Sequence, residues 1–431
     1  MRRSVLSILV CVGVTAMVCA SAGAADGRAR QVVLRVANWG SPAVEGAFMA
    51  VEREISAEFE SLHPGVKLQL EMIPGFGQYV PKLIMMHVSG SMPDVINLDA
   101  SSAAVFIDNG VLRDLTPYIQ KDREFDLSLY FDNVVNIARR GDALYAIPLD
   151  FTPMVMYYSK TLFDCAGVPY PQEGWTWDDF LDKARKLTVF PKGADRPTQY
   201  GFNFENEMPL WALWLWTNGG DVLDPTGTKA VGWFDSPASI QAMQFLVDLM
   251  LKHRVAPTLA ERRAAGVDLF LDGRAAMDLK GHWMMIDYRA RKLDVGVVPL
   301  PTNGQKPATV VYEAGAAITT LARHPDVAWE YVKHQTSEGV QRRRVASGLA
   351  VSANRRAADH VAADPVEDAF LRIVQYARPP WGAKVERYPN CEDLGREMMQ
   401  DIQDGGMPVA EAMHRTARLM EAAVAEPETG R

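Results

Sequence analysis

Aromatic and acidic side chains follow three short apolar segments in the first hundred residues. Trp39 follows the first segment, Asp99 follows the third, and the glycine-rich stretch 74–77 follows the second, with Tyr79 just beyond it. An aromatic ring offers a flat apolar surface for stacking, and a carboxylate accepts hydrogen bonds from hydroxyl groups. These residue types could together bind a small polar organic molecule.

The elements that would position these residues are strands that alternate with helices. Residues 32–39, 66–72 and 93–99 have the composition or alternation of strands. Apolar residues recur every three or four positions over 48–62, which predicts a helix, and 78–89 is a second helical segment. A β-α-β-α-β order predicts parallel strands with helices on both faces. Because ligands of such sheets bind beyond the carboxyl ends of the strands, the candidate residues would meet at one edge.

Each of these residues also has a structural interpretation. Trp39 could pack against the first helix, and Tyr79 is open to the same two interpretations. Asp99 could cap the helix that follows it. The sequence leaves these alternatives open.

Two later apolar segments are candidates for crossings between two lobes. Residues 144–163 form an extended run broken by two prolines, which suits an interdomain passage better than one strand of a single sheet. Asp150 lies in this run and could hold two adjacent hydroxyls or form a hinge hydrogen bond. The segment 308–319 resembles a return crossing. Tyr312 and Glu313 interrupt it, and a charge there is costly unless it is paired or faces a cleft.

The segment 207–221, EMPLWALWLWTNGGD, predicts a helix that ends at the glycine-rich stretch 218–220. A strand pattern lies just upstream, so the helix would begin at the ligand edge of a sheet. Trp211 at its front is a candidate ligand contact. Trp214 and Trp216, farther along, are expected in the core.

Composition and the N-terminal residues indicate an exported protein with two domains. The 431-residue chain has a net charge of −8, which argues against nucleic acid as a partner. A basic start, a short apolar run and small residues near Ala24 predict a signal peptide over 1–24 and a periplasmic location. Only Cys165 and Cys391 remain after its removal, and the sequence does not decide whether they pair.

Motifs for catalysis or metal binding are missing from the sequence. It contains no G-x-S-x-G, H-E-x-x-H, P-loop or C-x-x-C motif, and its eight histidines lack metal-ligand spacing. No catalytic residue, metal or cofactor is therefore predicted.

Several motifs in a characteristic order resemble those of one protein family. They are Pro148-Leu149-Asp150 followed by Val155-Met156-Tyr157-Tyr158, Trp177-Asp178-Asp179-Phe180, Asn218-Gly219-Gly220-Asp221, Gly273 to Met277 with Gly281-His282-Trp283, and Asp294-Val295-Gly296 with Pro299-Leu300-Pro301. Over nearly its whole mature length the chain resembles the family 1 extracellular solute-binding proteins of ABC importers, the maltodextrin-type, sugar-binding periplasmic proteins. Ser159 departs from the family pattern, which usually has Asn or Asp at this position.

The resemblance implies an α/β fold with two lobes, each a mainly parallel sheet flanked by helices, joined by several hinge crossings. The N-terminal lobe would comprise 25–149 and 308–358, and the C-terminal lobe 150–307 and 359–431. A carbohydrate or polyol ligand would bind in the cleft, and the lobes would close on it by hinge bending. The closed protein, a monomer, would then deliver the ligand to an inner-membrane ABC permease.

The resemblance also indicates particular site residues. Trp283 matches a family tryptophan that stacks on sugar, and Glu207 matches a position that contacts sugar. Arg387 lies in a loop where the family often places another contact. A carbohydrate-active enzyme with two catalytic carboxylates and a receptor subunit for chemotaxis or signalling remain alternatives.

Overall fold

The computed structural model describes residues 31–425, apart from 41–44, 347 and 349–350. The predicted signal peptide, 1–24, lies outside the described residues. Within them no helix is long and apolar enough to cross a membrane. Cys165 is exposed and Cys391 is buried, and both are free thiols, which settles the question of their pairing.

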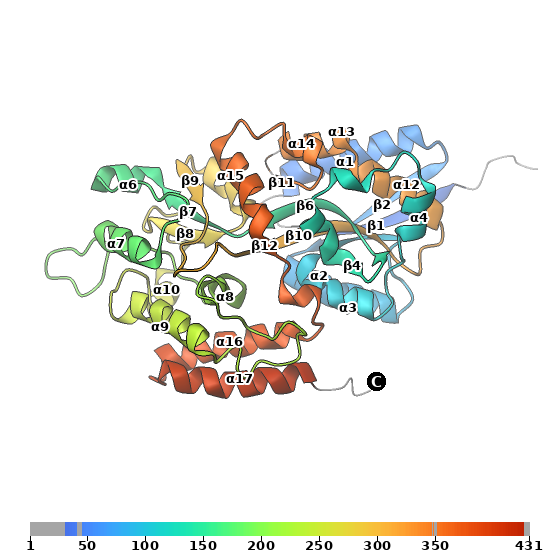
Figure 1. The fold of residues 1–431 in the computed structure, drawn as a ribbon. Helices are drawn as coiled ribbons and strands as arrows, with labels where there is room; N and C mark the ends of the chain where they lie inside the picture. Colours follow the sequence, from blue (N-terminus) through green and yellow to red (C-terminus); the bar gives the residue numbers. More distant parts are fainter. Residues whose placement is uncertain (1–30, 41–44, 347, 349–350, 426–431) are drawn as a thin grey trace, which may run out of the picture.

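The first lobe is built on a sheet of seven strands (Figure 1). The strands are β1 (Val32–Gly40), β2 (Val66–Pro74), β3 (Val95–Asp99), β6 (Ile147–Pro153), β10 (Thr309–Ile318), β11 (Val351–Ser352) and β12 (Ala377–Arg378). The order is β11-β6-β10-β3-β1-β2, and β12 pairs with β10. The predicted parallel pairing of β1 with β2 and β3 is confirmed. Strand β6 runs antiparallel to both β10 and β11, and β10 runs antiparallel to β3. The sheet as a whole is therefore mixed.

Helices cover both faces of this sheet, as predicted (Figure 1). The first lobe contains α1 (Glu45–Leu62), α2 (Phe76–Val88), α3 (Ala103–Asp108), α4 (Thr116–Lys121), α5 (Asp132–Val135), α12 (Pro325–Thr336), α13 (Glu338–Ala346), α14 (Arg355–Ala358) and the short strands β4 (Arg139–Arg140) and β5 (Ala143–Leu144). Helix α1 contacts α12 and α13 on one face, and α2 contacts β1 and β2. Ile55 and Phe59 of the predicted stripe on α1 are fully buried.

The second lobe contains a sheet of three strands, β7 (Val155–Ser159), β8 (Met277–Lys280) and β9 (Val295–Val298). The central strand β7 runs antiparallel to both neighbours. The two-lobed α/β fold is therefore as predicted, but a mainly parallel sheet is wrong for these three strands. The reason is that β7 arrives directly from the first sheet, whereas β8 and β9 are reached through the helices of the second lobe.

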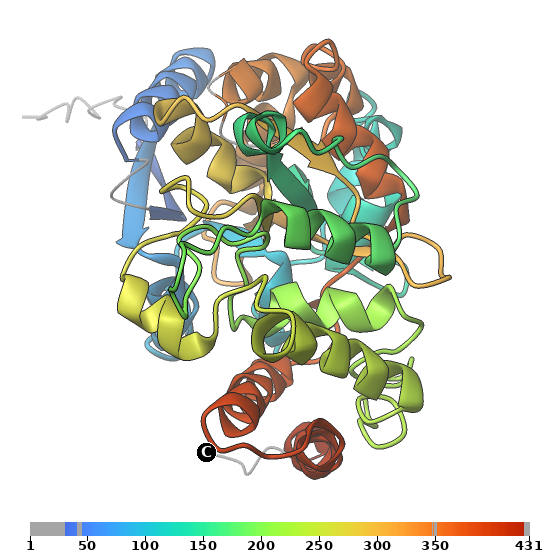
Figure 2. The same ribbon diagram turned by 90° about the vertical axis from the view of Figure 1, so that its left-hand side faces the viewer.

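The helices of the second lobe are α6 (Lys160–Ala166), α7 (Trp177–Leu187), α8 (Met208–Trp216), α9 (Pro237–Leu251), α10 (Leu259–Ala265), α11 (Met285–Ala290), α16 (Tyr388–Gln403) and α17 (Val409–Ala425). The predicted cap of α7 is confirmed: Thr176 and Asp179 form a reciprocal capping box. Figure 2 shows α16 and α17 packed side by side at one end of the molecule.

The chain passes between the lobes at positions that the sequence indicated. Strands β6 and β7 belong to different sheets and are separated only by Met154. After β9 the chain returns to the first sheet as β10. A further helix, α15 (Pro365–Ile373), contacts β6 and β11 of the first lobe and β9 of the second.

The two faces of the second sheet belong to different hydrophobic clusters. Met156 and Tyr158 point into a cluster formed mainly by the second lobe. Tyr157, between them, points the other way and joins the cluster that fills the first lobe. Its ring lies 5.0 Å from that of Tyr288 and 6.1 Å from that of Phe370 on α15. Apolar packing is therefore continuous from one lobe to the other through α15.

Candidate functional site

Strands β3, β6 and β10 present three candidate residues on one face of the first sheet. Asp99 of β3 and Asp150 of β6 both lie opposite Ala314 of β10, on its two sides. Cross-strand partners share a face, and so do residues two apart on a strand. Asp99, Asp150 and Tyr312 are therefore brought to the same face, as a common site requires.

The carboxylates of Asp99 and Asp150 are recessed: both side chains are only partly accessible to water. Burial raises the pKa of each to about 6, although Ser101 hydrogen bonds to Asp99 and the charge of Arg344 near Asp150 lower it. Ser101 N donates to Asp99 Oδ1 at 2.8 Å, and Ala314 N donates to Asp150 Oδ1 at 3.3 Å. The cap and the hinge hydrogen bond are thus both present. Within the described chain neither involves Oδ2, so both residues keep an oxygen for a ligand.

Glu392 of α16 adds a third recessed carboxylate, from the second lobe. Burial raises its pKa to about 7 against the lowering effect of Arg396, and the charges of Asp393, Glu207 and Asp99 raise it further. Because Asp99 belongs to the first lobe, the two lobes present acidic groups to each other here. The sequence did not indicate Glu392, since it is one of several acidic residues on an amphipathic helix.

Tyr312 lies between the lobes and packs against the hydrophobic clusters of both. Burial raises its pKa above the usual range, and the charges of Glu392 and Asp99 add to this. It therefore places an aromatic ring close to carboxylates of both lobes.

Glu313 points to the opposite face of β10 from Tyr312, because side chains alternate along a strand. Its exposed fraction is 3%, and neither carboxylate oxygen has a hydrogen-bond partner in the described part of the protein. Burial raises the pKa of Glu313 well above its ordinary value, which favours the protonated form. The sequence predicted that this charge would be paired or would face a cleft. Instead, burial suppresses the charge, and Glu313 does not share the face of the other candidates.

Tyr79 is a core residue in this structure, with an exposed fraction of 1%. Its hydroxyl donates to the carbonyl oxygens of Ala37 and Asn97 at 3.1 and 2.9 Å, so it ties β1 to β3. Trp39 is half-buried and meets the ring of Tyr79 edge-on at a centroid distance of 5.2 Å. Of this pair, only Trp39 has accessible surface for a ligand.

Helix α8 is apolar on all sides, so it is buried all round. The predicted helix is confirmed, and Trp214 and Trp216 are in the core as expected. Trp211 is equally buried, at 1% exposure, packed against Phe234 at a centroid distance of 6.4 Å. Trp211, predicted as a ligand contact, is therefore a core residue in this conformation.

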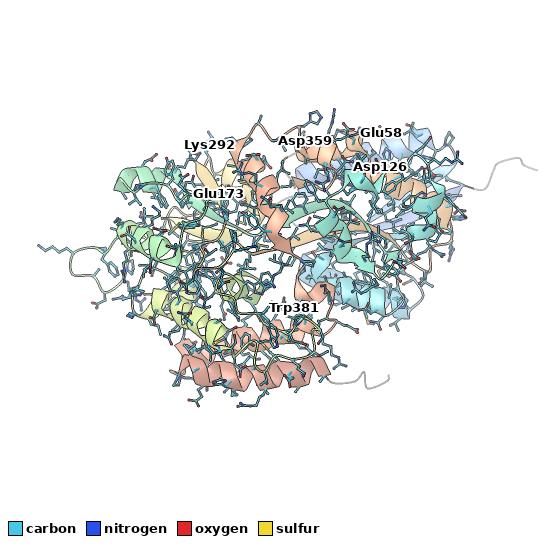
Figure 3. The ribbon with its side chains drawn as sticks, viewed as in Figure 1. Glu58, Asp126, Glu173, Lys292, Asp359 and Trp381 are labelled. Atoms are coloured by element: carbon cyan, nitrogen blue, oxygen red, sulfur yellow. The ribbon has the colours of Figure 1, made fainter. Side chains whose placement is uncertain are left out.

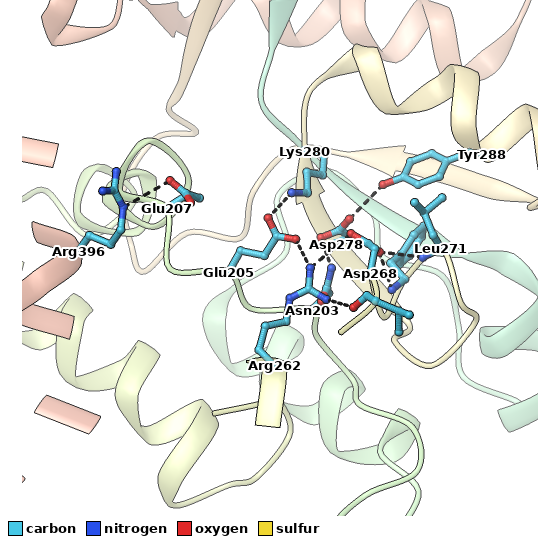
Figure 4. Close-up of polar contacts among 12 residues, drawn as sticks. Asn203, Glu205, Glu207, Arg262, Asp268, Leu271, Asp278, Lys280, Tyr288 and Arg396 are labelled. Carbon is cyan, nitrogen blue, oxygen red and sulfur yellow. Dashed lines mark hydrogen bonds and ion pairs between the residues drawn. The ribbon is translucent and has the colours of Figure 1, made fainter. Parts of the chain in front are cut away.

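Glu207 occupies the N-cap position of α8 without a side-chain capping hydrogen bond and is exposed, with its Oε2 atom 3.8 Å from Nε of Arg396 (Figure 4). A separate polar network lies nearby in the second lobe. There Glu205 contacts Lys280 and Arg262, and buried Asp278, whose pKa burial raises to about 7, accepts from Tyr288 at 3.0 Å. The charges of this network are largely matched, whereas Glu207 stays accessible.

Trp283 has an exposed fraction of 44%, so its indole is available for stacking. It lies on the 3₁₀ turn His282–Met284, directly after β8 and in contact with β6. Arg387 is half-buried and immediately precedes α16, the helix that carries Glu392. Both therefore lie near the passages between the lobes.

Asp221 is the centre of a further cluster of polar and aromatic side chains, whose contacts the sequence did not predict. It accepts from the indole nitrogens of Trp216 at 2.7 Å and Trp381 at 3.1 Å, and it pairs with Arg378 at 2.9 Å. The Arg378 guanidinium stacks 3.7 Å above the Trp216 ring. The 3₁₀ turn Trp381–Ala383 also contacts the turn after Asp99 in the first lobe, and Figure 3 shows Trp381 between the lobes. This group links α8 to the first lobe.

The family of the chain follows from comparison with known proteins. The model of the bacterial extracellular solute-binding protein family matches residues 44–342, which is more than half of the chain. The chain belongs to this family. Within the described residues no group of three or more His, Cys, Asp or Glu side chains is arranged to hold a metal ion.

Individual relatives are distant. The chain is 22% identical over 257 residues to a binding protein of Brucella abortus, a match that spans 58% of this chain and 59% of that protein. It is 26% identical over 285 residues to the arabinooligosaccharide-binding protein of Halalkalibacterium halodurans, spanning 62% and 60%. The chain thus matches about three fifths of the length of these curated relatives.

Solved structures show the same fold. An ABC substrate-binding protein from Listeria monocytogenes, in complex with cycloalternan, superposes with a TM-score of 0.79 at 23% identity, over 91% of this chain and 98% of that one. The sugar-binding protein MalE from Xanthomonas citri gives a TM-score of 0.78 at 20% identity, with the same coverage. These likenesses establish the two-lobed architecture of the solute-binding proteins.

Proposed function

We propose that this protein captures a carbohydrate or related polyol between its two lobes and delivers it to an ABC permease. The observation that carries the proposal is the meeting of recessed carboxylates from both lobes, Asp99 and Asp150 from the first and Glu392 from the second, around Tyr312. Carboxylate oxygens accept hydrogen bonds from hydroxyls, and the partly buried ring of Tyr312 adds apolar contact. A polyhydroxylated molecule uses both.

The names of the relatives agree with this ligand class. The Halalkalibacterium protein is named for arabinooligosaccharides, and the Listeria and Xanthomonas structures are of a cycloalternan complex and a sugar-binding protein. Their sequences differ too much from this one to transfer the particular sugar.

The charge around Tyr312 favours a neutral ligand. Raised pKa values at Asp99, Asp150 and Glu392 mean that negative charge is already costly there. A sugar phosphate or uronic acid would add more negative charge to the same place. Neutral sugars and polyols are therefore the proposed class, with Trp39, Glu207, Trp283 and Arg387 as further candidate contacts.

Closure by rotation of the lobes is part of the proposal. We place the lobes at 25–149 with 308–358 and at 150–307 with 359–431, except that β6 continues the first sheet to Pro153, so Asp150 belongs to the first lobe. The β6–β7 passage and the return to β10 would join them. The protein would act in the periplasm as a monomer after removal of residues 1–24. We propose a binding role without catalysis because the family is one of binding proteins.

The test is a thermal-shift screen of the purified protein against neutral mono-, di- and oligosaccharides, polyols, sugar phosphates and uronic acids. A ligand that binds only the folded state raises the unfolding temperature. We expect one or more neutral sugars to raise the unfolding temperature. Calorimetry should confirm their binding, and the bound sugar should be recovered without hydrolysis. Tight binding of sugar phosphates alone would overturn the ligand class, and hydrolysis of an oligosaccharide hit would favour an enzyme.

A further inference from the structure

We propose that His282 and Glu367 are positioning residues that fix the direction of the Trp283 indole. The inference rests on the proposed function, in which Trp283 contacts the ligand. Neither residue can contact a ligand itself in this conformation, because their exposed fractions are 1% and 5%. Their effect would reach the ligand only through the exposed tryptophan beside them.

The turn that carries Trp283 is held at two points through His282. The main-chain N–H of His282 donates to Oγ1 of Thr152 on β6 at 2.6 Å. The imidazole Nε2 atom lies 2.8 Å from Oε2 of Glu367 on α15. The imidazole also meets the ring of Phe370 edge-on at 4.9 Å, so its direction is fixed on the side of α15.

The carboxylate of Glu367 is itself held from the second lobe. Arg289 on α11 donates to its Oε1 atom at 2.7 Å. Burial alone would raise the pKa of Glu367, but the hydrogen bonds and charges of His282 and Arg289 outweigh it and hold that pKa low. The contact with His282 is thus a hydrogen bond to a charged acceptor, which is stronger than a neutral one.

The indole of Trp283 lies against Gly281 on its inner side. A Cβ atom added at Gly281 would fall 2.2 Å from the indole ring, so the ring lies directly over the glycine backbone. The carbonyl of Gly281 accepts from the hydroxyl of Tyr157 at 3.1 Å. With its inner side fixed and His282 anchored, the ring keeps one exposed side for a ligand.

Both anchors of His282 belong to elements that connect the lobes. Thr152 lies on β6, one strand of the direct passage, and Glu367 lies on α15, which contacts sheets of both lobes. The position of Trp283 therefore follows the relative position of the lobes, and closure would move this indole together with the passage.

The test uses full-length protein labelled with 5-fluorotryptophan and ¹⁹F NMR. The chain has ten tryptophans, and the Trp283 signal is assigned by its loss in Trp283→Phe. We expect Glu367→Ala and Thr152→Val each to displace the Trp283 signal by more than its linewidth, while the other signals stay in place. Glu367→Gln, which can still accept one hydrogen bond from His282, should restore most of the wild-type position.

The matched control is Asp368→Asn, which removes a half-exposed charge, paired with Arg372, next to Glu367 on α15. It should leave the Trp283 signal unchanged. An unmoved signal in folded Glu367→Ala and Thr152→Val overturns the inference; if Glu367→Ala does not fold, Thr152→Val decides alone. This readout needs no ligand. A parallel titration with maltotriose tests the proposed function separately. We expect the affinity for maltotriose to weaken at least fivefold in the variants whose Trp283 signal is displaced. If the wild type does not bind maltotriose, this sugar is rejected as the ligand, and the NMR result is unaffected.

Discussion

The charge of Asp99, at the end of β3, raises the pKa of Glu392 on α16 although the two residues belong to different lobes. Burial is the larger cause of the shift, but the effect of Asp99 shows that two elements far apart in the sequence come close enough for their carboxylates to interact electrostatically. A ligand whose hydroxyl groups donate to both would replace this repulsion with hydrogen bonds, and closure would then be favoured only when the ligand is present.

Glu392→Gln should stabilise the ligand-free protein at pH 8 and change little at pH 5. The folded-state pKa, about 7, lies above the ordinary value of 4.5. The folded state therefore holds a proton that the unfolded state releases, and stability falls as pH rises through this window. Glutamine does not titrate, so the variant avoids this loss of stability. Urea unfolding at both pH values measures the difference. Glu397→Gln, which changes an exposed residue of α16 whose charge does not act on Glu392, is the matched control. Equal effects of Glu392→Gln at pH 5 and 8 would contradict the assignment.

The affinity for a neutral sugar should rise from pH 5 to pH 8. Asp99 and Asp150 have pKa values of about 6, and only the ionised carboxylate offers all its lone pairs to sugar hydroxyls. Calorimetry of the best sugar from the screen measures the trend. Asp150→Asn should bind more weakly and flatten the pH dependence. A pH-independent affinity in wild type would remove these carboxylates from the site.

Trp283→Ala should weaken sugar binding by at least tenfold, or about 1.4 kcal/mol, without unfolding the protein. The indole is 44% exposed, so its loss leaves no buried cavity. Trp233→Ala, at a site 40% exposed, is the matched control. Affinities measured by calorimetry that are equal in Trp283→Ala and wild type would exclude Trp283 from the site.

Trp214→Ala should lower the free energy of unfolding of the protein by about 3–5 kcal/mol, the usual cost of truncating a buried aromatic residue. Its ring packs against those of Phe180 and Phe202, at centroid distances of 5.1 and 5.9 Å. Chemical denaturation measures the loss, and sugar affinity at low temperature should be retained. A loss of affinity in the folded variant would instead place Trp214 near the ligand.

Local sequence patterns predicted most of the helices and strands and several candidate site residues. The segment upstream of α8 is an exception, because its strand pattern forms only isolated bridges. Alternation and strand ends indicated Asp99, and the polar interruptions of the apolar crossings indicated Asp150 and Tyr312, which share one face. For Tyr79 the sequence did contain evidence of a core position. Leu83 follows it by four residues, so the two side chains lie on the same face of the helix, and Leu83 is fully buried. That spacing identifies Tyr79 as part of the core.

Other features depended on tertiary packing that no local pattern contains. The direction of β7 follows from its direct passage out of the first sheet, and the pattern of a strand is the same in either direction. Glu392 resembles the other acidic residues of α16 until Asp99 is placed opposite it. Trp211 was expected at the ligand edge, but the packing of α16 against α8 buries it: a Cβ at Gly395 would lie 3.0 Å from its ring.

The continuous packing of Tyr157, Tyr288 and Phe370 has a consequence for the folding of the chain. Because one face of the second sheet shares the hydrophobic cluster of the first lobe, neither lobe can unfold without exposing apolar surface of the other. The two lobes should melt as a single cooperative unit, even though the proposed closure moves them relative to each other. A fragment that carries only 150–307 would lack α15 and would expose Tyr157 to water. Such a fragment would aggregate rather than fold independently.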